Sequence, residues 1–455
     1  PTMTFRLIVF IDLFFIHVGA NHATRKFIIP LSASSGCSVS INEDLNEPQP
    51  LVLVAKNLGV GYRWPVDTTG TLKFAANEEF RLVCSGNGNY LMDVGDNKIQ
   101  DIAAYCVSDK TFLVNSVEYE FADLVCKKTV PSVVRKTGKT CLNSYTQLEI
   151  GFDLGKDFLG TMDVCRDQNT FVTYYVKVNL PKSIGGFQSG YPRPSWSQSD
   201  FWGPYAIGDL YYRPVQKSTM SLILKSEDLG QTYISSTTNY YFARGHLAPK
   251  ADFVYGSAQR STFWYINAAP QWQTFNAGNW MFLESDVRKY ASSSQLDLEI
   301  FTGVHGIATL PDEKSIRREL YFYATGKERA LPIPKFFWKI VYDPISRKGT
   351  AFVGVNDVYV TELTDDRFIC EDVSGKIPWL SWQPASIRKG ISYACSIDSE
   401  SSNIGNVRLA TQCTVSVRQL RSIRNTARRL RTFLFYRSEY SQQLAPSRTE
   451  FHPRK

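Results

Sequence analysis

The chain has 455 residues, of which 43% are hydrophobic, 21% are charged and a high 13% are aromatic. This composition is that of a globular protein and excludes a disordered or fibrous chain, and the length predicts two to three domains. The net charge of +8 comes from the C-terminal end, because residues 414–455 hold ten Arg or Lys against two Glu and the remainder is balanced.

The N-terminus has the order of a secretory signal. A short basic start at Met3–Arg6 precedes an apolar run at Leu7–Val18 and small residues up to Ala23. This order predicts a signal peptide over residues 1–23. The run is short for a membrane span and no later stretch reaches a spanning length, so we expect a secreted, extracellular protein without a membrane segment.

The cysteines fit an exported protein. Six of the nine precede residue 170 and three follow residue 365: Cys37, Cys84, Cys106, Cys126, Cys141, Cys165, Cys370, Cys395 and Cys413. None forms a Cys-x-x-Cys pair, so we expect scattered disulfides rather than a zinc ribbon. The grouping predicts two separately stapled regions with connectivity left open and one cysteine unpaired or paired between chains.

Residues 24–180 are predicted to form a β-rich region. Short apolar runs punctuated by Gly, Asn and Asp mark its strands, the clearest of which are 51–54, 80–83, 111–114 and 171–176. No set of residues in this region converges on chemistry. We therefore expect it to be a disulfide-stapled module with a binding or folding role.

A segment at 181–204, rich in Pro, Gly, Ser and Trp, predicts a domain boundary. Beyond it, helix-like and strand-like segments alternate, with candidate strands at 296–301, 336–341 and 350–355. The sequence thus predicts an α+β domain over residues 181–413.

Histidine is scarce in this domain. Of five histidines in the chain, only His246 and His305 lie outside the leader and the C-terminal end. Imidazole is the side chain whose ordinary pKa suits proton transfer near neutral pH. Each of the two is therefore a candidate base, and His305, which follows a predicted strand, is better interpreted as structural or substrate-lining.

The spacing around His246 predicts a strand, a loop, a second strand and a helix. The first strand ends at Arg244-Gly245-His246, the second spans 261–266 and closes with Asn267, residues 268–271 turn the chain, and a helix follows residues 276–278. On that helix Trp280, Leu283 and Val287 mark the buried face, whereas Glu284 and Arg288, four residues apart, share another face.

Such a motif gathers the parts that phosphodiester hydrolysis requires. A neutral imidazole takes a proton from water, an amide oxygen with waters holds Mg²⁺, and guanidinium groups match phosphate oxygens. An activated water and a cation that stabilises phosphate charge complete the set.

The C-terminal tail, residues 414–455, has a helical pattern. Apolar residues recur at three- and four-residue steps beside a parallel arginine stripe: Leu420, Ile423, Ala427, Leu430 and Leu434, with Arg421, Arg424, Arg428 and Arg431. Two interpretations stay open. The tail is an amphipathic helix docked on the body with solvated arginines, or the stripe attracts phosphate backbones.

The segments 244–249, 267–271, 276–280 and 283–284, together with Arg288, resemble the DNA/RNA non-specific endonucleases of the ββα-metal superfamily. The whole chain resembles their secreted arthropod branch, including insect double-stranded ribonucleases. The resemblance covers about half of the chain, from Pro181 to Cys413. It implies a ββα-metal nuclease domain behind the β-rich region.

The resemblance also implies residue roles. His246 is the general base and Asn276 the protein ligand of Mg²⁺, with Mn²⁺ as a substitute. Asn267 stands beside the histidine as an orienting or phosphate-contacting amide, and Glu284 holds metal-bound water or the metal shell. Arg244 and Arg288 bind or stabilise phosphate.

Three positions are less directly matched. The family pattern opens with Asp before Arg-Gly-His, where this chain has Ala243. A further family arginine lies upstream, and Arg213 is the candidate for it. Trp272, in the predicted turn, is a candidate contact for a base or sugar, whereas a core position is the alternative for it.

The bland alternatives are that His246 is a packed strand-end histidine and that Arg288 only pairs with Glu284. The favoured function is a secreted, Mg²⁺-dependent, sugar-non-specific endonuclease that cleaves DNA and RNA through backbone contacts, favouring double-stranded RNA by the resemblance. The competing hypothesis is an inactive nuclease-fold protein that binds nucleic acid or a protein partner. A zinc hydrolase is disfavoured by the shortage of histidine and the lack of a His-x-x-x-His pair.

Overall fold

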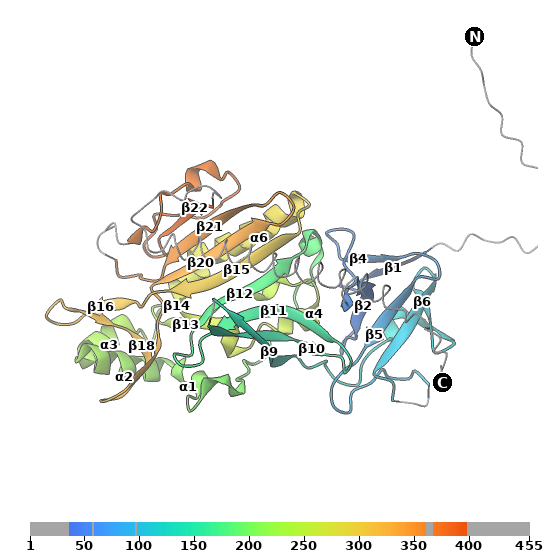
Figure 1. Cartoon of the computed structure of the whole chain (residues 1–455), viewed down its shortest axis with the longest axis horizontal. Helices are drawn as coiled ribbons and strands as arrows, with labels where there is room; N and C mark the ends of the chain where they lie inside the picture. Colours follow the sequence, from blue (N-terminus) through green and yellow to red (C-terminus); the bar gives the residue numbers. More distant parts are fainter. Residues whose placement is uncertain (1–35, 57–58, 96–97, 143, 361–366, 398–455) are drawn as a thin grey trace, which may run out of the picture. The chain divides into compact units, whose positions relative to one another are not determined.

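The computed structural model describes residues 36–56, 59–95, 98–142, 144–360 and 367–397 (Figure 1). The predicted signal peptide, the predicted tail helix and Cys413 lie outside these residues. Within them, no helix is long and apolar enough to cross a membrane.

The first part of the described chain is all β. It forms a two-stranded sheet of order β1-β4 and a six-stranded sheet of order β3-β2-β5-β6-β7-β8. The strands are β1 (Cys37–Ser40), β2 (Leu51–Lys56), β3 (Gly59–Tyr62), β4 (Thr71–Phe74), β5 (Glu79–Val83), β6 (Asp101–Ser108), β7 (Thr111–Val114) and β8 (Val117–Glu120). Phe80 and Phe112 pack at 5.4 Å between ring centroids. The β-rich prediction is confirmed here, and three of its candidate strands lie in β2, β5 and β7.

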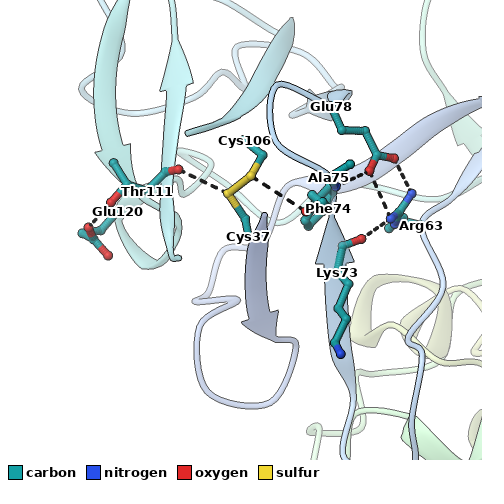
Figure 2. The surroundings of a disulfide bond; sticks show 9 residues. All are labelled: Cys37, Arg63, Lys73, Phe74, Ala75, Glu78, Cys106, Thr111 and Glu120. Carbon is teal, nitrogen blue, oxygen red and sulfur yellow. Dashed lines mark hydrogen bonds and ion pairs between the residues drawn. A yellow bond between two sulfur atoms is a disulfide. The ribbon is translucent and has the colours of Figure 1, made fainter. Parts of the chain in front are cut away.

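Four disulfides use eight cysteines, in the pairs Cys37–Cys106, Cys84–Cys126, Cys141–Cys165 and Cys370–Cys395. Figure 2 shows the first of them beside an ion pair in which Arg63 Nη1 lies 2.6 Å from Glu78 Oε1. The grouping into two stapled regions needs one correction. The Cys141–Cys165 bond belongs to the second sheet rather than to the N-terminal sheets, because β10 pairs with the strand on either side of it.

The second large sheet has eight strands in the order β22-β21-β20-β15-β12-β11-β10-β9, and neighbouring strands are antiparallel. They are β9 (Val133–Cys141), β10 (Tyr145–Asp153), β11 (Phe158–Arg166), β12 (Thr173–Leu180), β15 (Leu298–His305), β20 (Phe336–Asp343), β21 (Lys348–Val355) and β22 (Ser392–Ser396). The candidate strands 336–341 and 350–355 lie inside β20 and β21.

This sheet continues across the predicted boundary at residue 181. Strand β12, before the boundary, pairs with β15, beyond it, from Tyr175 opposite Gly303 to Leu180 opposite Leu298. The Pro- and Gly-rich segment 181–204 therefore begins a long excursion between β12 and β15, two neighbouring strands of one sheet. Turn-rich composition marks the connection but cannot tell which strands pair across it.

Helices and two-stranded sheets complete the second part of the chain. The helices are α1 (Ile207–Leu210), α2 (Arg213–Leu224), α3 (Glu227–Tyr233), α4 (Gly256–Arg260), α5 (Gln273–Phe275) and α6 (Met281–Ser293). The paired strands are β13 (Phe242–His246) with β14 (Ala268–Trp272), β16 (Thr309–Pro311) with β17 (Arg317–Glu319), and β18 (Tyr321–Ala324) with β19 (Arg329–Pro332). Short 3₁₀ turns lie at Phe121–Asp123, Lys182–Gly186, Asp200–Trp202, Lys250–Asp252, Tyr265–Asn267 and Ser374–Lys376.

Helix α6 packs on the eight-stranded sheet through one apolar stripe. Leu283, Val287 and Ala291 are spaced four residues apart and are buried, as predicted for the first two. Just before the helix, the ring of Trp280 lies 5.7 Å from that of Phe337 in β20. The stripe fixes the rotation of α6 and leaves Glu284 and Arg288 on a neighbouring face.

The β-rich part contacts the loop that joins β13 to β14. Gln188 Nε2 donates to Ile41 O at 2.6 Å, and Gln188 Oε1 accepts from Gly256 N at 2.6 Å. Tyr255 stacks on Tyr62 with ring centroids 4.8 Å apart. The N-terminal sheets thus support the loop that follows His246.

Candidate active site

The β13–β14 hairpin positions His246 and Arg244. In its antiparallel register His246 is opposite Ala268 and Arg244 is opposite Pro270. Side chains two residues apart lie on one face of a strand, so the imidazole and the guanidinium of Arg244 share a face. Gly245 between them leaves no room for a Cβ, which would lie 2.4 Å from Gln271 Oε1.

The second strand of the motif lies later than predicted. Residues 261–266 were expected to be the strand and 268–271 the turn, whereas the strand is β14 at 268–272 and a 3₁₀ turn occupies 265–267. The aromatic run 263–265 favours a strand by propensity, and Pro270 argues against one. A two-stranded hairpin has only edges, so a proline without an N–H is tolerated there.

The side chain of Asn267 is bonded to backbone groups of two loop residues. Its side chain is fully buried, and its Oδ1 accepts from Ala248 N at 2.9 Å. Its Nδ2 donates to Ala248 O and to Thr262 O, both at 2.9 Å. These bonds hold the chain immediately after His246, and they leave the amide no accessible atom for a phosphate.

The helix of the motif begins with a π-helical turn at Asn276–Trp280, placed between α5 and α6. Such turns widen a helix locally and recur at functional sites. Asn276 is partly buried, and within the described ranges its side chain makes one hydrogen bond, a long one of 3.5 Å from Nδ2 to Gln273 Oε1. Among the described residues nothing donates to its Oδ1, so that oxygen is available to a ligand.

His246 sits in an aromatic enclosure. Its ring centroid lies 4.6 Å from that of Trp196 and 5.0 Å from that of Phe263. The Nε2 atom is buried and has no hydrogen-bond partner among the described residues. Burial and, to a smaller extent, the positive charge of Arg193 lower the pKa of His246 to about 3. The imidazole is therefore neutral at physiological pH.

Glu284, in the first turn of α6, and Lys339, in β20, influence each other's pKa. Burial raises the pKa of Glu284 to about 7, while Lys339, Arg288 and Arg193 oppose that rise and Asp252 adds to it. Lys339 is 1% exposed, and its Nζ donates to Thr302 Oγ1 at 2.6 Å. Burial lowers the pKa of Lys339 against the pull of both carboxylates.

Arg193 affects both His246 and Glu284. Its positive charge lowers the pKa of both groups. The side chain is exposed, with its Cζ 5.9 Å from the ring centroid of Phe263. Sequence reasoning missed this arginine, which lies in the segment interpreted as a domain boundary.

Arg244 and Arg213 differ in the contacts that their guanidinium groups make. Arg244 lies over Tyr211 and Tyr265, with its Cζ 4.9 Å and 5.7 Å from their ring centroids. Arg213 donates to Ser236 O at 2.6 Å and lies 4.0 Å over the ring of Tyr241. The guanidinium of Arg213, the candidate for the upstream family arginine, thus contacts the segment 236–241 that precedes β13.

Arg288 pairs with Asp252, whereas the sequence suggested phosphate or Glu284 as its partner. Its Nη1 lies 2.9 Å from Oδ1 of Asp252, in the loop after β13. The pair joins α6 to that loop.

Trp272 is placed differently from the sequence-based expectation. It is 1% exposed and packs against Phe242 at 4.1 Å and Tyr359 at 5.4 Å between ring centroids. A ring enclosed in this way has no free face for a base or sugar, so the core alternative holds for this residue. His305 ends β15, where burial and Lys335 lower its pKa.

The donor set near Asn276 fits magnesium. Mg²⁺ keeps most of its water and takes one or two oxygen ligands from a protein, which matches the amide oxygen of Asn276 that has no donor among the described residues. Within the described residues there is no cluster of three or more His, Cys, Asp or Glu able to hold a metal.

Comparison with known proteins gives a family match and relatives of similar length. The family described as DNA/RNA non-specific endonuclease matches residues 144–400, a span that begins before the predicted boundary at 181 and includes most of the eight-stranded sheet. A salivary endonuclease of Lutzomyia longipalpis is 27% identical over 343 residues, which cover 75% of this chain and 76% of that protein. Salivary protein Tsal2A of Glossina morsitans morsitans is 25% identical over 372 residues, covering 79% and 89%.

Among solved structures, a chain in the crystal structure of the EndoG/EndoGI complex is 18% identical with a TM-score of 0.30. The likeness covers 45% of this chain and 75% of that one.

Proposed function

Because the chain belongs to the DNA/RNA non-specific endonuclease family, we propose that it hydrolyses phosphodiester bonds of DNA and RNA, with His246 as general base and Asn276 as the protein ligand of Mg²⁺. The observation that carries this proposal is the β13–β14 register, which places the neutral imidazole of His246 and the guanidinium of Arg244 on one face of the hairpin. Arg193, whose positive charge lowers the pKa of both His246 and Glu284, adds a second guanidinium that can bind phosphate.

His246 takes the proton of the attacking water. Burial keeps the imidazole neutral, so it is ready to accept a proton at neutral pH. Its Nε2 faces the interior, whereas the residue as a whole is only partly buried. We therefore assign proton uptake to Nδ1, on the accessible edge of the ring.

The remaining side chains hold the phosphate and its surroundings. Arg193 contacts phosphate oxygens, with Arg244 beside His246 on β13 and Arg288 held by Asp252. Glu284 in its ionised form offers an oxygen to water at the site. Asn276 would hold Mg²⁺, which would supply positive charge that stabilises the negative charge on the phosphate and the leaving oxygen.

Backbone recognition makes the reaction independent of base sequence. We further propose that the protein is secreted, in keeping with its disulfides and its predicted signal peptide. Relatives carry salivary names. Double-stranded RNA is the proposed preferred substrate, on the resemblance to the arthropod branch.

A cleavage assay on matched duplex and single-stranded RNA and DNA, with and without chelator, tests the proposal. We expect cleavage of all four with Mg²⁺, and a loss of at least 100-fold for His246→Ala. Binding without cleavage, equal for the wild type and His246→Ala, would instead support the inactive binding protein. That alternative is favoured by Ala243, where the family pattern has an acid.

A further inference from the structure

The π turn that carries Asn276 is attached to a distant segment of the chain, residues 383–390. Asn279, within the turn, donates its backbone N–H to Lys389 O at 2.9 Å. Gly278 has φ −103° and ψ −123°, outside the helical region. A Cβ on Gly278 would lie 2.6 Å from the same carbonyl oxygen, so only glycine permits this approach.

The side chain of Asn279 makes the attachment specific. It is fully buried. Its Nδ2 donates to Gln383 O at 2.7 Å and to Gly390 O at 2.6 Å, and its Oδ1 accepts from Gln383 N at 2.9 Å. One amide therefore satisfies three backbone groups at the two ends of the segment.

Buried aromatic residues flank the turn. Phe275 and Trp280 stand on either side of it, with ring centroids 5.6 Å apart. Gly390 packs so closely on Phe275 that a Cβ there would lie 2.2 Å from the ring. Asn276 follows Phe275 directly, so the direction of its side chain depends on how the segment seats this turn.

We propose that Asn279 is a positioning residue. It holds the segment 383–390 against the π turn and thereby orients the amide oxygen of Asn276 toward the metal. This inference rests on the proposed function, which assigns Asn276 to Mg²⁺. Groups that orient a metal ligand from behind typically change metal affinity 10- to 100-fold when removed.

The test measures binding of Mn²⁺ alone, by electron paramagnetic resonance with Mg²⁺ competition and without nucleic acid. Asn356→Ala is the matched control. Asn356 is also fully buried. Its Nδ2 donates to Pro270 O at 3.1 Å and Pro334 O at 2.9 Å, and its Oδ1 accepts from Trp272 N at 2.9 Å. Both variants lose buried hydrogen bonds from a side-chain amide to backbone groups. Only Asn279 belongs to the π turn that carries Asn276.

We expect Asn279→Ala to weaken Mn²⁺ binding about tenfold or more, and Asn356→Ala to leave the affinity within about twofold, since it loses no contact at the metal residue. Raising Mg²⁺ should restore kcat in Asn279→Ala, which a general loss of structure would not allow. If Asn279→Ala fails to fold, Asn279→Asp keeps the shape and the bond from Gln383 N but, as a carboxylate, donates to neither Gln383 O nor Gly390 O. It should show the same weakening.

Wild-type affinity in a folded Asn279 variant, or equal weakening in both asparagine variants, would overturn the inference. Asn276→Ala separates this from failure of the proposed function. If that variant binds Mn²⁺ as the wild type does, the metal assignment itself is wrong. If it loses binding while Asn279→Ala does not, only the positioning role falls.

Discussion

Asp252 and Arg288 join the loop after His246 to helix α6, with Arg288 Nη1 2.9 Å from Asp252 Oδ1. The Asp252 side chain is 3% exposed and that of Arg288 is 19% exposed, so the pair is largely shielded from water. A guanidinium has five N–H donors. The bond to Asp252 therefore fixes Arg288 in place while leaving donors for a phosphate.

Asp252→Ala should destabilise the protein by about 3 kcal/mol, because it leaves a buried guanidinium without its partner. Urea unfolding measures the change. Asp101→Ala is the control, since it breaks the more exposed Arg81–Asp101 pair on the N-terminal sheet, where a loss of less than about 1 kcal/mol is expected. Equal losses in the two variants would contradict the view that the Asp252–Arg288 pair holds the site together.

Arg193→Ala should raise KM for nucleic acid about tenfold. It should also reduce the slope of log KM against log salt concentration by about 1, the value expected for the loss of one phosphate contact. Arg213→Ala should do neither, because its guanidinium is bonded to Ser236 O and packed on Tyr241. Steady-state cleavage at several salt concentrations distinguishes the two arginines. A larger effect from Arg213 would show that the upstream arginine was assigned correctly from the sequence alone.

The sequence located the local motif well and the long-range contacts poorly. The sequence indicated a motif that contains Arg244, His246, Asn276 and Glu284. It could do so because the residues of a hairpin and the helix after it lie close together in sequence. Arg193 and Lys339 are more than 50 residues from either His246 or Glu284 along the chain. No periodicity links them to the motif.

Lys339 illustrates the difficulty. It lies in the apolar strand β20, where an isolated lysine reads as a solvent-facing residue, yet it is 1% exposed beside Asp252 and Glu284. Its role follows only from the packing of α6 on the sheet. The shift of β14 has a similar cause, since its pairing with β13 overrides the weak strand propensity of Ala-Ala-Pro-Gln.

The pH profile of kcat/KM should rise through pH 7 because of Glu284 rather than His246. Burial raises the pKa of Glu284 to about 7, so below that pH the carboxyl is protonated and activity falls. The pKa of His246 is lowered to about 3, so the imidazole stays neutral from pH 5 to 8 and gives no transition there. Glu284→Gln should lower the rate and remove the transition, and a transition near pH 7 that survives in this variant would refute the assignment.

Ala243→Asp should stabilise the hairpin. Ala243 is directly opposite Gln271 in the β13–β14 register, and Gln271 is fully buried with neither side-chain polar atom paired among the described residues. Opposed residues bring their Cβ atoms to about 5 Å, so an introduced carboxylate reaches Gln271 Nε2. One new bond to a previously unpaired buried donor predicts a gain of about 1 kcal/mol in urea unfolding.

The gain should vanish in the double variant with Gln271→Leu, which removes the donor, and should be absent in Ala243→Val, which adds bulk without an acceptor. A gain that persists without Gln271 would place its origin elsewhere. Since Ala243 and Gln271 share the face of the hairpin opposite His246, the substitution changes the support of the strand rather than the reacting groups. Ala243→Asp should therefore leave the pH profile of cleavage unchanged while it raises stability.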